Sequence, residues 1–129
     1  MQDSGIKGSA RILIADDSSS IRSNLKKILE SRPNRWKVCA EAVNGVEAVQ
    51  MAVRSKPDLI ILDFQMPSMD GLIASGRISK SLPAVPILMF TIHKSEYIEL
   101  EARKAGVHTV ISKSDPAGLL RMVKALLSE

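Results

Sequence analysis

Short apolar runs alternate with longer segments of helical periodicity along this chain, and this alternation restricts the fold more than any other feature. The apolar runs, which we predict to be strands, span residues 12–15, 36–42, 59–62, 87–90 and 107–111. The helical segments span about residues 19–31, 46–54, 71–81 and 95–104, and a last one begins at residue 116. Strict alternation favours right-handed crossovers between parallel strands, so we expect an α/β protein whose parallel sheet carries helices on both faces.

Composition supports one compact domain. The 129 residues are 45% hydrophobic and 25% charged, a balance that suits a folded core and not a disordered chain. No apolar run approaches the ~20 residues of a membrane span, and the first residues lack the apolar stretch of a secretory signal. The lone Cys39 can form no intrachain disulfide, so we expect a cytoplasmic protein without membrane contact. Residues 1–9 are polar and aperiodic, which predicts a flexible lead-in followed by one domain over residues 10–129.

Charge and aromatic content argue against two classes of ligand. The net charge of +4 is scattered along the chain, and we interpret the basic residues around the first helix, including Arg22, as a solvated face. Only four aromatic residues occur, which disfavours surfaces that stack nucleic-acid bases or a flavin ring.

The residues that follow the predicted strands carry the chemistry, because ligands of such sheets bind beyond the carboxyl ends of the strands. Asp16 and Asp17 follow the first strand, Asp63 follows the third, Thr91 follows the fourth and Lys113 follows the fifth. Taken singly, these acids could be helix caps or turn residues. If the strand order is 2-1-3-4-5, however, the first and third strands are neighbours and all three carboxylates share one crevice.

Three carboxylates in one crevice favour a bound cation. Two such charges ~4 Å apart repel by about 4 kcal/mol at an effective dielectric constant near 20. Mg²⁺ prefers oxygen ligands and often binds one or two carboxylates together with phosphate oxygens. Thr91 and Lys113 would add a hydroxyl and an ammonium group for a phosphoryl group. A carboxylate can itself attack phosphorus and form an acyl phosphate, and Asp63 is the natural candidate.

In this order and spacing the motifs resemble the receiver domain of two-component response regulators. The resemblance rests on Asp16-Asp17, on Asp63-Phe64-Gln65-Met66-Pro67-Ser68-Met69-Asp70-Gly71, on Thr91 and on Lys113, and it covers about residues 10–129. It implies a flavodoxin-like, doubly wound sheet of five parallel strands in the order 2-1-3-4-5 with five helices. It also implies a phosphoacceptor switch rather than an enzyme, which a sensor histidine kinase or phosphotransfer domain phosphorylates.

The resemblance assigns a role to each site residue. It implies that Asp63 accepts the phosphoryl group, and that Asp17 and Asp63 bind Mg²⁺ directly while Asp16 acts through water. The main-chain carbonyl of Gln65 would be a further metal ligand. Lys113 would pair with one phosphoryl oxygen, and Thr91 would move to hydrogen-bond another.

The chain departs from the family at three positions. Ser114 follows Lys113 where many receivers have a proline in a cis peptide, and a cis bond before serine costs ~2.5 to 4 kcal/mol, so we expect a trans peptide. Val110 stands where the family usually has a Tyr or Phe that swings inward on activation. Ile92 replaces a small residue, and with Gln65 and the loop residue His93 it is expected to tune the phosphoryl lifetime.

The output of the switch is predicted from weaker signals. Residues 44–48 and 106–114 look most like receivers joined to helix-turn-helix domains, so we expect regulation of transcription through a DNA-binding domain outside this chain. A homodimer through the fourth helix, fifth strand and fifth helix is a further expectation. Two other functions are possible for such a fold. A flavodoxin-like electron carrier is disfavoured because the acidic pair would repel a flavin phosphate, and an aspartyl-phosphate phosphatase needs a second acid where Gln65 stands.

Overall fold

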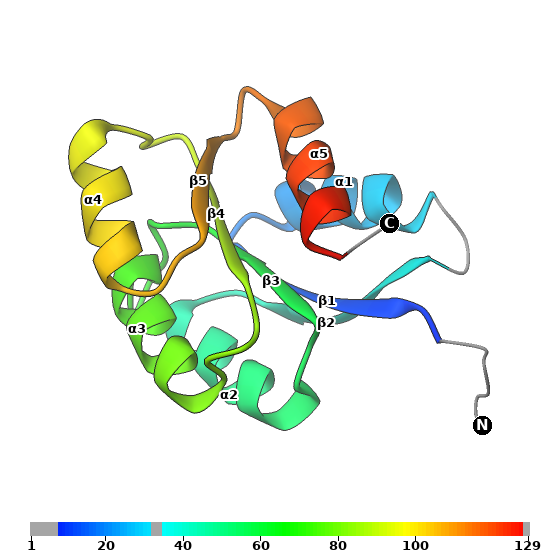
Figure 1. The fold of residues 1–129 in the computed structure, drawn as a ribbon, viewed down its shortest axis with the longest axis horizontal. Coiled ribbons are helices and arrows are strands. Elements are labelled where there is room, and N and C mark those ends of the chain that lie inside the picture. The colour runs from blue at the N-terminus through cyan, green and yellow to red at the C-terminus, as the bar shows by residue number, and fades with distance from the viewer. Residues whose placement is uncertain (1–7, 32–34, 128–129) are drawn as a thin grey trace.

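The computed structural model describes residues 8–31 and 35–127, which form five strands and five helices in alternation (Figure 1). The strands are β1 (Ala10–Ala15), β2 (Trp36–Ala42), β3 (Leu59–Leu62), β4 (Ile87–Thr91) and β5 (Thr109–Ser112). The helices are α1 (Ser19–Glu30), α2 (Gly45–Ser55), α3 (Gly71–Ser81), α4 (Glu96–Lys104) and α5 (Pro116–Leu126).

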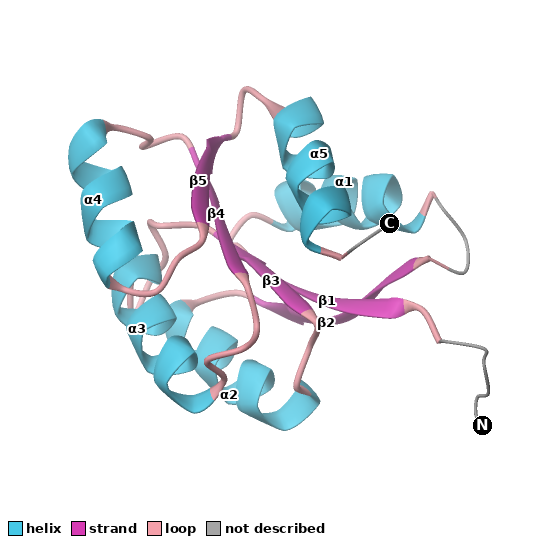
Figure 2. Ribbon diagram, viewed as in Figure 1, coloured by secondary structure: helices cyan, strands magenta, loops and turns pink. Residues whose placement is uncertain are grey.

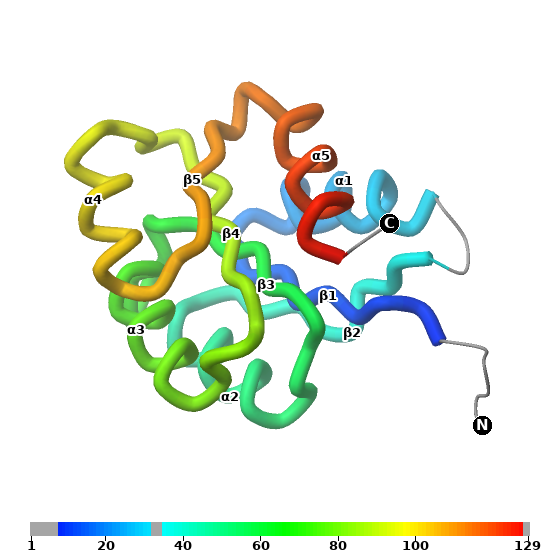
Figure 3. The backbone as a smooth tube through the Cα atoms, in the orientation of Figure 1, coloured from blue at the N-terminus to red at the C-terminus, as the bar shows by residue number. Residues whose placement is uncertain are grey.

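The strands form one parallel sheet in the order β2-β1-β3-β4-β5, as predicted (Figure 2). Helices α1 and α5 cover one face, and α2, α3 and α4 cover the other (Figure 3). Alternate residues of each central strand therefore enter different cores: Ile12 and Ile14 pack toward α1 and α5, whereas Leu13 and Ala15 join the opposite cluster. Burial on both faces explains why these strands read as continuous apolar runs.

Every helix begins with a polar cap beside the carboxyl end of the preceding strand. The side chains of the five N-cap residues accept hydrogen bonds from backbone N–H groups of the first turn, and these residues are Ser18, Asn44, Asp70, Ser95 and Asp115. Such caps satisfy donors that the helix cannot pair internally. The helix N-termini thus meet the strand carboxyl ends at one edge of the sheet.

The predicted fifth strand begins two residues too early. Val107 is buried like a strand residue, but its N–H donates to the Ala102 carbonyl at 2.9 Å and closes the end of α4. Gly106 has a φ of +93°, which confirms the predicted left-handed stop. An apolar residue within this closing turn has the same pattern as the start of a strand, so periodicity alone cannot separate the two.

The lead-in, the peptide after Lys113 and the absence of a membrane span were also predicted from the sequence. The first seven residues of the predicted lead-in 1–9 lie outside the described residues. The peptide between Lys113 and Ser114 is trans, since residues 8–31 and 35–127 contain no cis peptide bond. In the same ranges, no helix has the length and apolar content that crossing a membrane requires.

Candidate functional site

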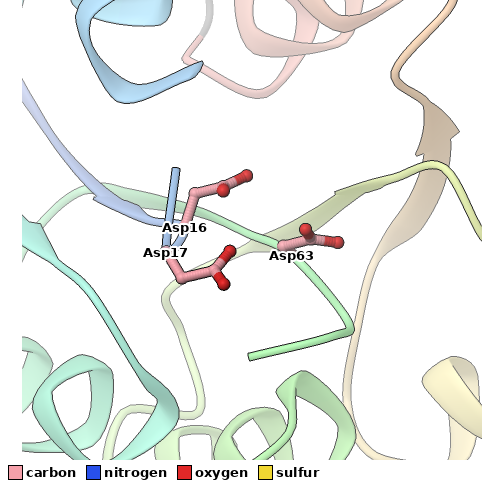
Figure 4. Close-up of side chains that lie close together, drawn as sticks. All are labelled: Asp16, Asp17 and Asp63. Carbon is pink, nitrogen blue, oxygen red and sulfur yellow. The ribbon is translucent and has the colours of Figure 1, made fainter. Parts of the chain in front are cut away.

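Three aspartates meet at the carboxyl ends of β1 and β3, as the strand order requires. Asp16, Asp17 and Asp63 each offer a carboxylate oxygen, and these atoms all lie within 4.8 Å of one another (Figure 4). Asp16 and Asp63 are 3% and 6% exposed, whereas Asp17 is exposed to solvent. The site therefore combines two carboxylates that are removed from water with one that remains accessible.

Backbone hydrogen bonds that extend the sheet ladder hold the two buried aspartates in place. The Asp16 N–H donates to the Ala42 carbonyl and the Asp63 N–H donates to the Ala15 carbonyl, both at 3.0 Å. The start of α3 packs tightly behind Asp63, because a Cβ at Gly71 would collide with the Asp63 carbonyl oxygen. A glycine at residue 71 therefore permits the close approach that the predicted motif places there.

Lys113 bridges the two buried carboxylates. Its Nζ donates to Asp16 Oδ2 and to Asp63 Oδ2, each at 2.8 Å, and the side chain is 14% exposed. Burial lowers the pKa of Lys113, but hydrogen bonds and charge attraction from Asp16 and Asp63 outweigh this cost and raise the pKa above its ordinary value. Lys113 is therefore charged at neutral pH and balances part of the acidic cluster.

The chemistry of this donor set fits a hard divalent cation. Three carboxylates face one ammonium group, so the cluster keeps a net negative charge after Lys113 is counted. All the acidic ligand atoms are oxygens, which Mg²⁺ prefers over nitrogen or sulfur. The accessible carboxylate of Asp17 leaves room for the waters that Mg²⁺ usually retains. The cluster could hold a metal ion, as the sequence predicts.

An open cleft of about 460 Å³ lies over this cluster and brings most of the predicted site residues together. Its lining residues are Asp16, Asp17, Ser18, Asp63, Gln65, Met66, Pro67, Ile92, His93 and Lys113. Ile92 stands at the rim with 73% of its surface exposed. The cleft is polar at its floor and accessible from solvent, as a phosphoryl donor would require.

Two predicted residues lie outside the cleft lining. Thr91 is fully buried, and its Oγ1 accepts a hydrogen bond from the His93 N–H at 3.1 Å. Val110, on the neighbouring strand β5, is 5% exposed and lines grooves next to α4 and α5. In this conformation the Thr91 hydroxyl is thus engaged with its own loop, and Val110 faces the region between the last two helices.

A side-chain bridge that the sequence did not predict joins two loops at the cleft. His93 Nε2 lies 2.6 Å from Gln65 Oε1, and the His93 ring meets Phe64 edge to face at a centroid distance of 5.9 Å. The side chain of His93 is exposed, as expected of a loop histidine, but it is not free. Residues 65 and 93 are far apart in the sequence, and no local pattern marks their pairing.

Arg22 makes a second set of contacts that the sequence did not predict. Its Nη1 donates to the Asp16 carbonyl at 2.8 Å, and its Nε forms a 3.1 Å ion pair with Glu41 of β2. The expected solvated face of α1 therefore contains one arginine that reaches the acidic loop. No local sequence pattern marks the pairing of Arg22 with Glu41, because it depends on β2 lying beside β1.

Comparisons with known proteins decide the family. A sequence model of the response regulator receiver domain matches residues 12–124. The chain belongs to this family. A response regulator receiver of this kind is a switch domain, and the resemblance and the flavodoxin-like fold that the sequence predicted are both confirmed.

The most informative relatives differ in the output that their names state. A protein-glutamate methylesterase/protein-glutamine glutaminase from Pseudomonas syringae is 37% identical over 123 residues, which cover 92% of this chain and 31% of that protein. A LuxR-family response regulator from Aurantimonas is 33% identical, with a TM-score of 0.86 over 93% of this chain and 86% of that one. The response regulator domain of Thermotoga maritima CheB is 28% identical, with a TM-score of 0.84 over 94% and 98%.

The present chain spans about a third of the curated methylesterase relative, so these similarities describe its receiver domain only. Regulation of transcription through a DNA-binding domain is not confirmed, because the relatives include methylesterases as well as a LuxR-family regulator.

Proposed function

We propose that this receiver accepts a phosphoryl group on Asp63 from the phosphohistidine of a sensor kinase or phosphotransfer protein, with Mg²⁺ as cofactor. The observation that carries the proposal is the Lys113 bridge between two buried aspartates, beside the accessible Asp17. Burial of charged groups is costly unless they are paired, so a chain retains such a cluster chiefly where the charges act.

In the proposed reaction, Asp63 is the nucleophile. A carboxylate oxygen of Asp63 bonds to phosphorus while the phosphorus–nitrogen bond of the phosphohistidine breaks, and the electron pair of that bond stays on the imidazole. Asp63 Oδ1 accepts a hydrogen bond from the Phe64 N–H at 2.7 Å and Oδ2 contacts Lys113, so the carboxylate is held in one orientation. Orientation of this kind lowers the entropic part of the barrier.

The surrounding residues would hold the cation and the phosphoryl oxygens. Asp17 and Asp63 would bind Mg²⁺ directly, Asp16 would act through water, and the main-chain carbonyl of Gln65 would complete the protein ligands. When bound, the ion neutralises charge that develops on the phosphoryl oxygens. The Lys113 ammonium group would exchange its contact with the Asp63 carboxylate for one with a phosphoryl oxygen.

Thr91 and Val110 would connect the site to the output face. Thr91 Oγ1 accepts the hydrogen bond from the His93 N–H, which leaves its O–H free to donate to a phosphoryl oxygen. Because Thr91 lies outside the cleft lining, such a bond requires the hydroxyl to move, and the loop between β4 and α4 would move with it. We propose that partners, including a second copy of the chain, read this change on α4, β5 and α5. Val110 lacks an aromatic ring that could swing inward, so we expect a smaller shift of population than in receivers with Tyr or Phe.

Two outputs are proposed for the switch. A DNA-binding output is supported by the LuxR-family relative, and a methylesterase output is supported by the 37% identical curated relative. Both would leave the receiver chemistry unchanged, because that chemistry needs only the residues of the cleft.

Phosphorylation by a small donor tests the proposal. The purified chain is incubated with acetyl phosphate and Mg²⁺, and intact-mass spectrometry is expected to find one added phosphoryl group per chain. The group should be removed by hydroxylamine, which cleaves acyl phosphates. Prior chelation of the metal should prevent the labelling. Labelling that is unaffected by chelation, or stable to hydroxylamine, would contradict the proposed chemistry.

Ile92 is expected to slow the loss of the phosphoryl group. Its branched side chain stands at the rim of the cleft, where it would hinder a water molecule from reaching the position in line with the aspartyl oxygen. Ile92→Ala should accelerate release several-fold, which corresponds to about 1 kcal/mol of barrier. Phosphate release from the purified phosphorylated chain measures this rate.

A matched variant separates shielding from a general effect of lost apolar surface. Val53 on α2 is 46% exposed and is not among the residues that line the cleft, so Val53→Ala should release phosphate at the parent rate. If Ile92→Ala releases phosphate no faster than Val53→Ala, the shielding argument is wrong.

A further inference from the structure

Arg22 contacts the acidic loop from outside the cleft. It lies in the first turn of α1, where its own N–H donates to the Ser18 carbonyl at 3.1 Å, and its side chain is 16% exposed. One guanidinium group makes two contacts, with the Asp16 carbonyl through Nη1 and with Glu41 through Nε. The rigid fork of arginine fixes the geometry of both contacts together.

The Asp16 carbonyl belongs to the peptide that also carries the Asp17 nitrogen. Because a peptide unit is planar, holding this carbonyl fixes the orientation of the backbone from which the Asp17 side chain projects. Asp16 itself is held independently, by its ladder hydrogen bond to Ala42 and by the contact with Lys113. The Arg22 contact therefore bears mainly on Asp17.

Asp17 needs such a constraint more than the other two aspartates. Its carboxylate is exposed, and in the part of the chain that the structure describes it has no hydrogen bond or ion pair of its own. Lys113 contacts only Asp16 and Asp63 within this cluster (Figure 4 shows the three aspartates). In the described residues, the backbone is thus what constrains the point and direction from which the Asp17 side chain projects.

Glu41 completes the arrangement from the neighbouring strand. It lies opposite Ile14 in the register of β1 and β2, and its carboxylate pairs with the Arg22 Nε at 3.1 Å. This pairing orients the guanidinium and balances a positive charge that would otherwise oppose a cation in the cleft.

We infer that Arg22, oriented by Glu41, is a positioning residue that aims Asp17 at the metal ion of the proposed phosphorylation site. The inference rests on the proposed function, because it requires a cation at the three aspartates. Contacts that orient a metal ligand typically contribute 10- to 100-fold to affinity. Arg22→Gln is accordingly expected to weaken divalent binding by about tenfold.

The direction of this effect separates positioning from simple electrostatics. Removal of a positive charge near a cation site should strengthen cation binding if charge alone acts. Loss of the constraint on Asp17 should weaken it. The matched control is Arg54→Gln, which removes the same charge from an exposed arginine at the end of α2 and should bind like the parent.

Mn²⁺ binding, measured by the electron paramagnetic resonance signal of the free ion, tests the inference on the unphosphorylated chain. Weaker binding by Arg22→Gln, with parent-like binding by Arg54→Gln, supports it, and equal or tighter binding by Arg22→Gln overturns it. In an Asp17→Asn background, Arg22→Gln should cause no further loss. A full additional tenfold loss of Mn²⁺ affinity in the double variant would mean that Arg22 does not act through Asp17. That result would overturn the inference.

The same experiment separates this inference from the proposed function. If the parent chain binds no Mn²⁺, the metal site fails and the role of Arg22 fails with it. If the parent binds Mn²⁺ and Arg22→Gln binds it equally well, only the role of Arg22 is overturned.

Discussion

Asp63→Ala is expected to accept no phosphoryl group from acetyl phosphate under conditions in which the parent chain accepts one. The substitution removes the nucleophilic oxygen and one of the three carboxylates that would bind Mg²⁺. The fold should survive, because Lys113 keeps its 2.8 Å contact with Asp16 and one fewer negative charge remains buried. Intact-mass spectrometry after incubation with acetyl phosphate and Mg²⁺ measures the expected loss.

Asp58, at the other end of β3 from Asp63, provides a control carboxylate. It precedes β3 at the opposite edge of the sheet, where its Oδ2 accepts a hydrogen bond from the Arg11 N–H at 2.8 Å. Asp58→Ala should therefore be phosphorylated to the same extent as the parent. Stoichiometric labelling of Asp63→Ala, or loss of labelling in Asp58→Ala, would refute the assignment of Asp63 as the acceptor.

The sequence predicted the aspartate cluster because it depends on features that are local in the chain. The pair Asp16-Asp17 follows the first apolar run and Asp63 follows the third, and the strand order brings the ends of these two runs together. Lys113 follows the same rule, as the residue after β5. Since helix caps and strand ends share one edge, reading the residues after each run was enough to assemble this part of the site.

Side-chain contacts between separate parts of the chain could not be predicted in the same way. The pairing of Gln65 with His93 depends on the rotamers of two exposed residues, and that of Arg22 with Asp16 and Glu41 depends on how α1 sits over β2. Neither pairing has a sequence period or a short motif. These contacts surround the predicted residues and are the ones expected to adjust their geometry.

The roles of Thr91 and Val110 illustrate a different limit. Sequence position put Thr91 correctly at the end of β4, yet in this conformation its hydroxyl is bound to the His93 N–H and is buried away from the cleft. A residue that acts by moving has a different environment in each of two conformations. The strand pattern predicts where such a residue lies along the sheet, but not which groups it contacts in either conformation. The proposed movement of Thr91 would therefore lead to a second conformation, which phosphorylation would stabilise.

Lys113→Met is expected to lower the free energy of unfolding by about 3 kcal/mol at neutral pH without divalent cations. Lys113 is the ammonium group that contacts both buried carboxylates, and methionine fills similar space without charge. Breaking a buried ion pair on one side is costly because the remaining charge is left unpaired. Urea denaturation measures the loss, and millimolar Mg²⁺ should restore part of it by supplying positive charge. An exposed control is Lys104→Met, whose partner Glu101 lies 3.3 Å away, and which should lose under ~0.5 kcal/mol.

The pH dependence of this difference follows from the direction of the lysine shift. The pKa of Lys113 is raised in the folded chain: burial opposes the shift, but the hydrogen bonds and charges of Asp16 and Asp63 outweigh it. A raised folded pKa means that the contribution of Lys113 is fully present below the unfolded pKa of about 10.4 and is lost as pH rises through the higher folded value. Parent and Lys113→Met unfolding free energies that stay parallel from neutral to strongly alkaline pH would show that the lysine contributes packing and not charge.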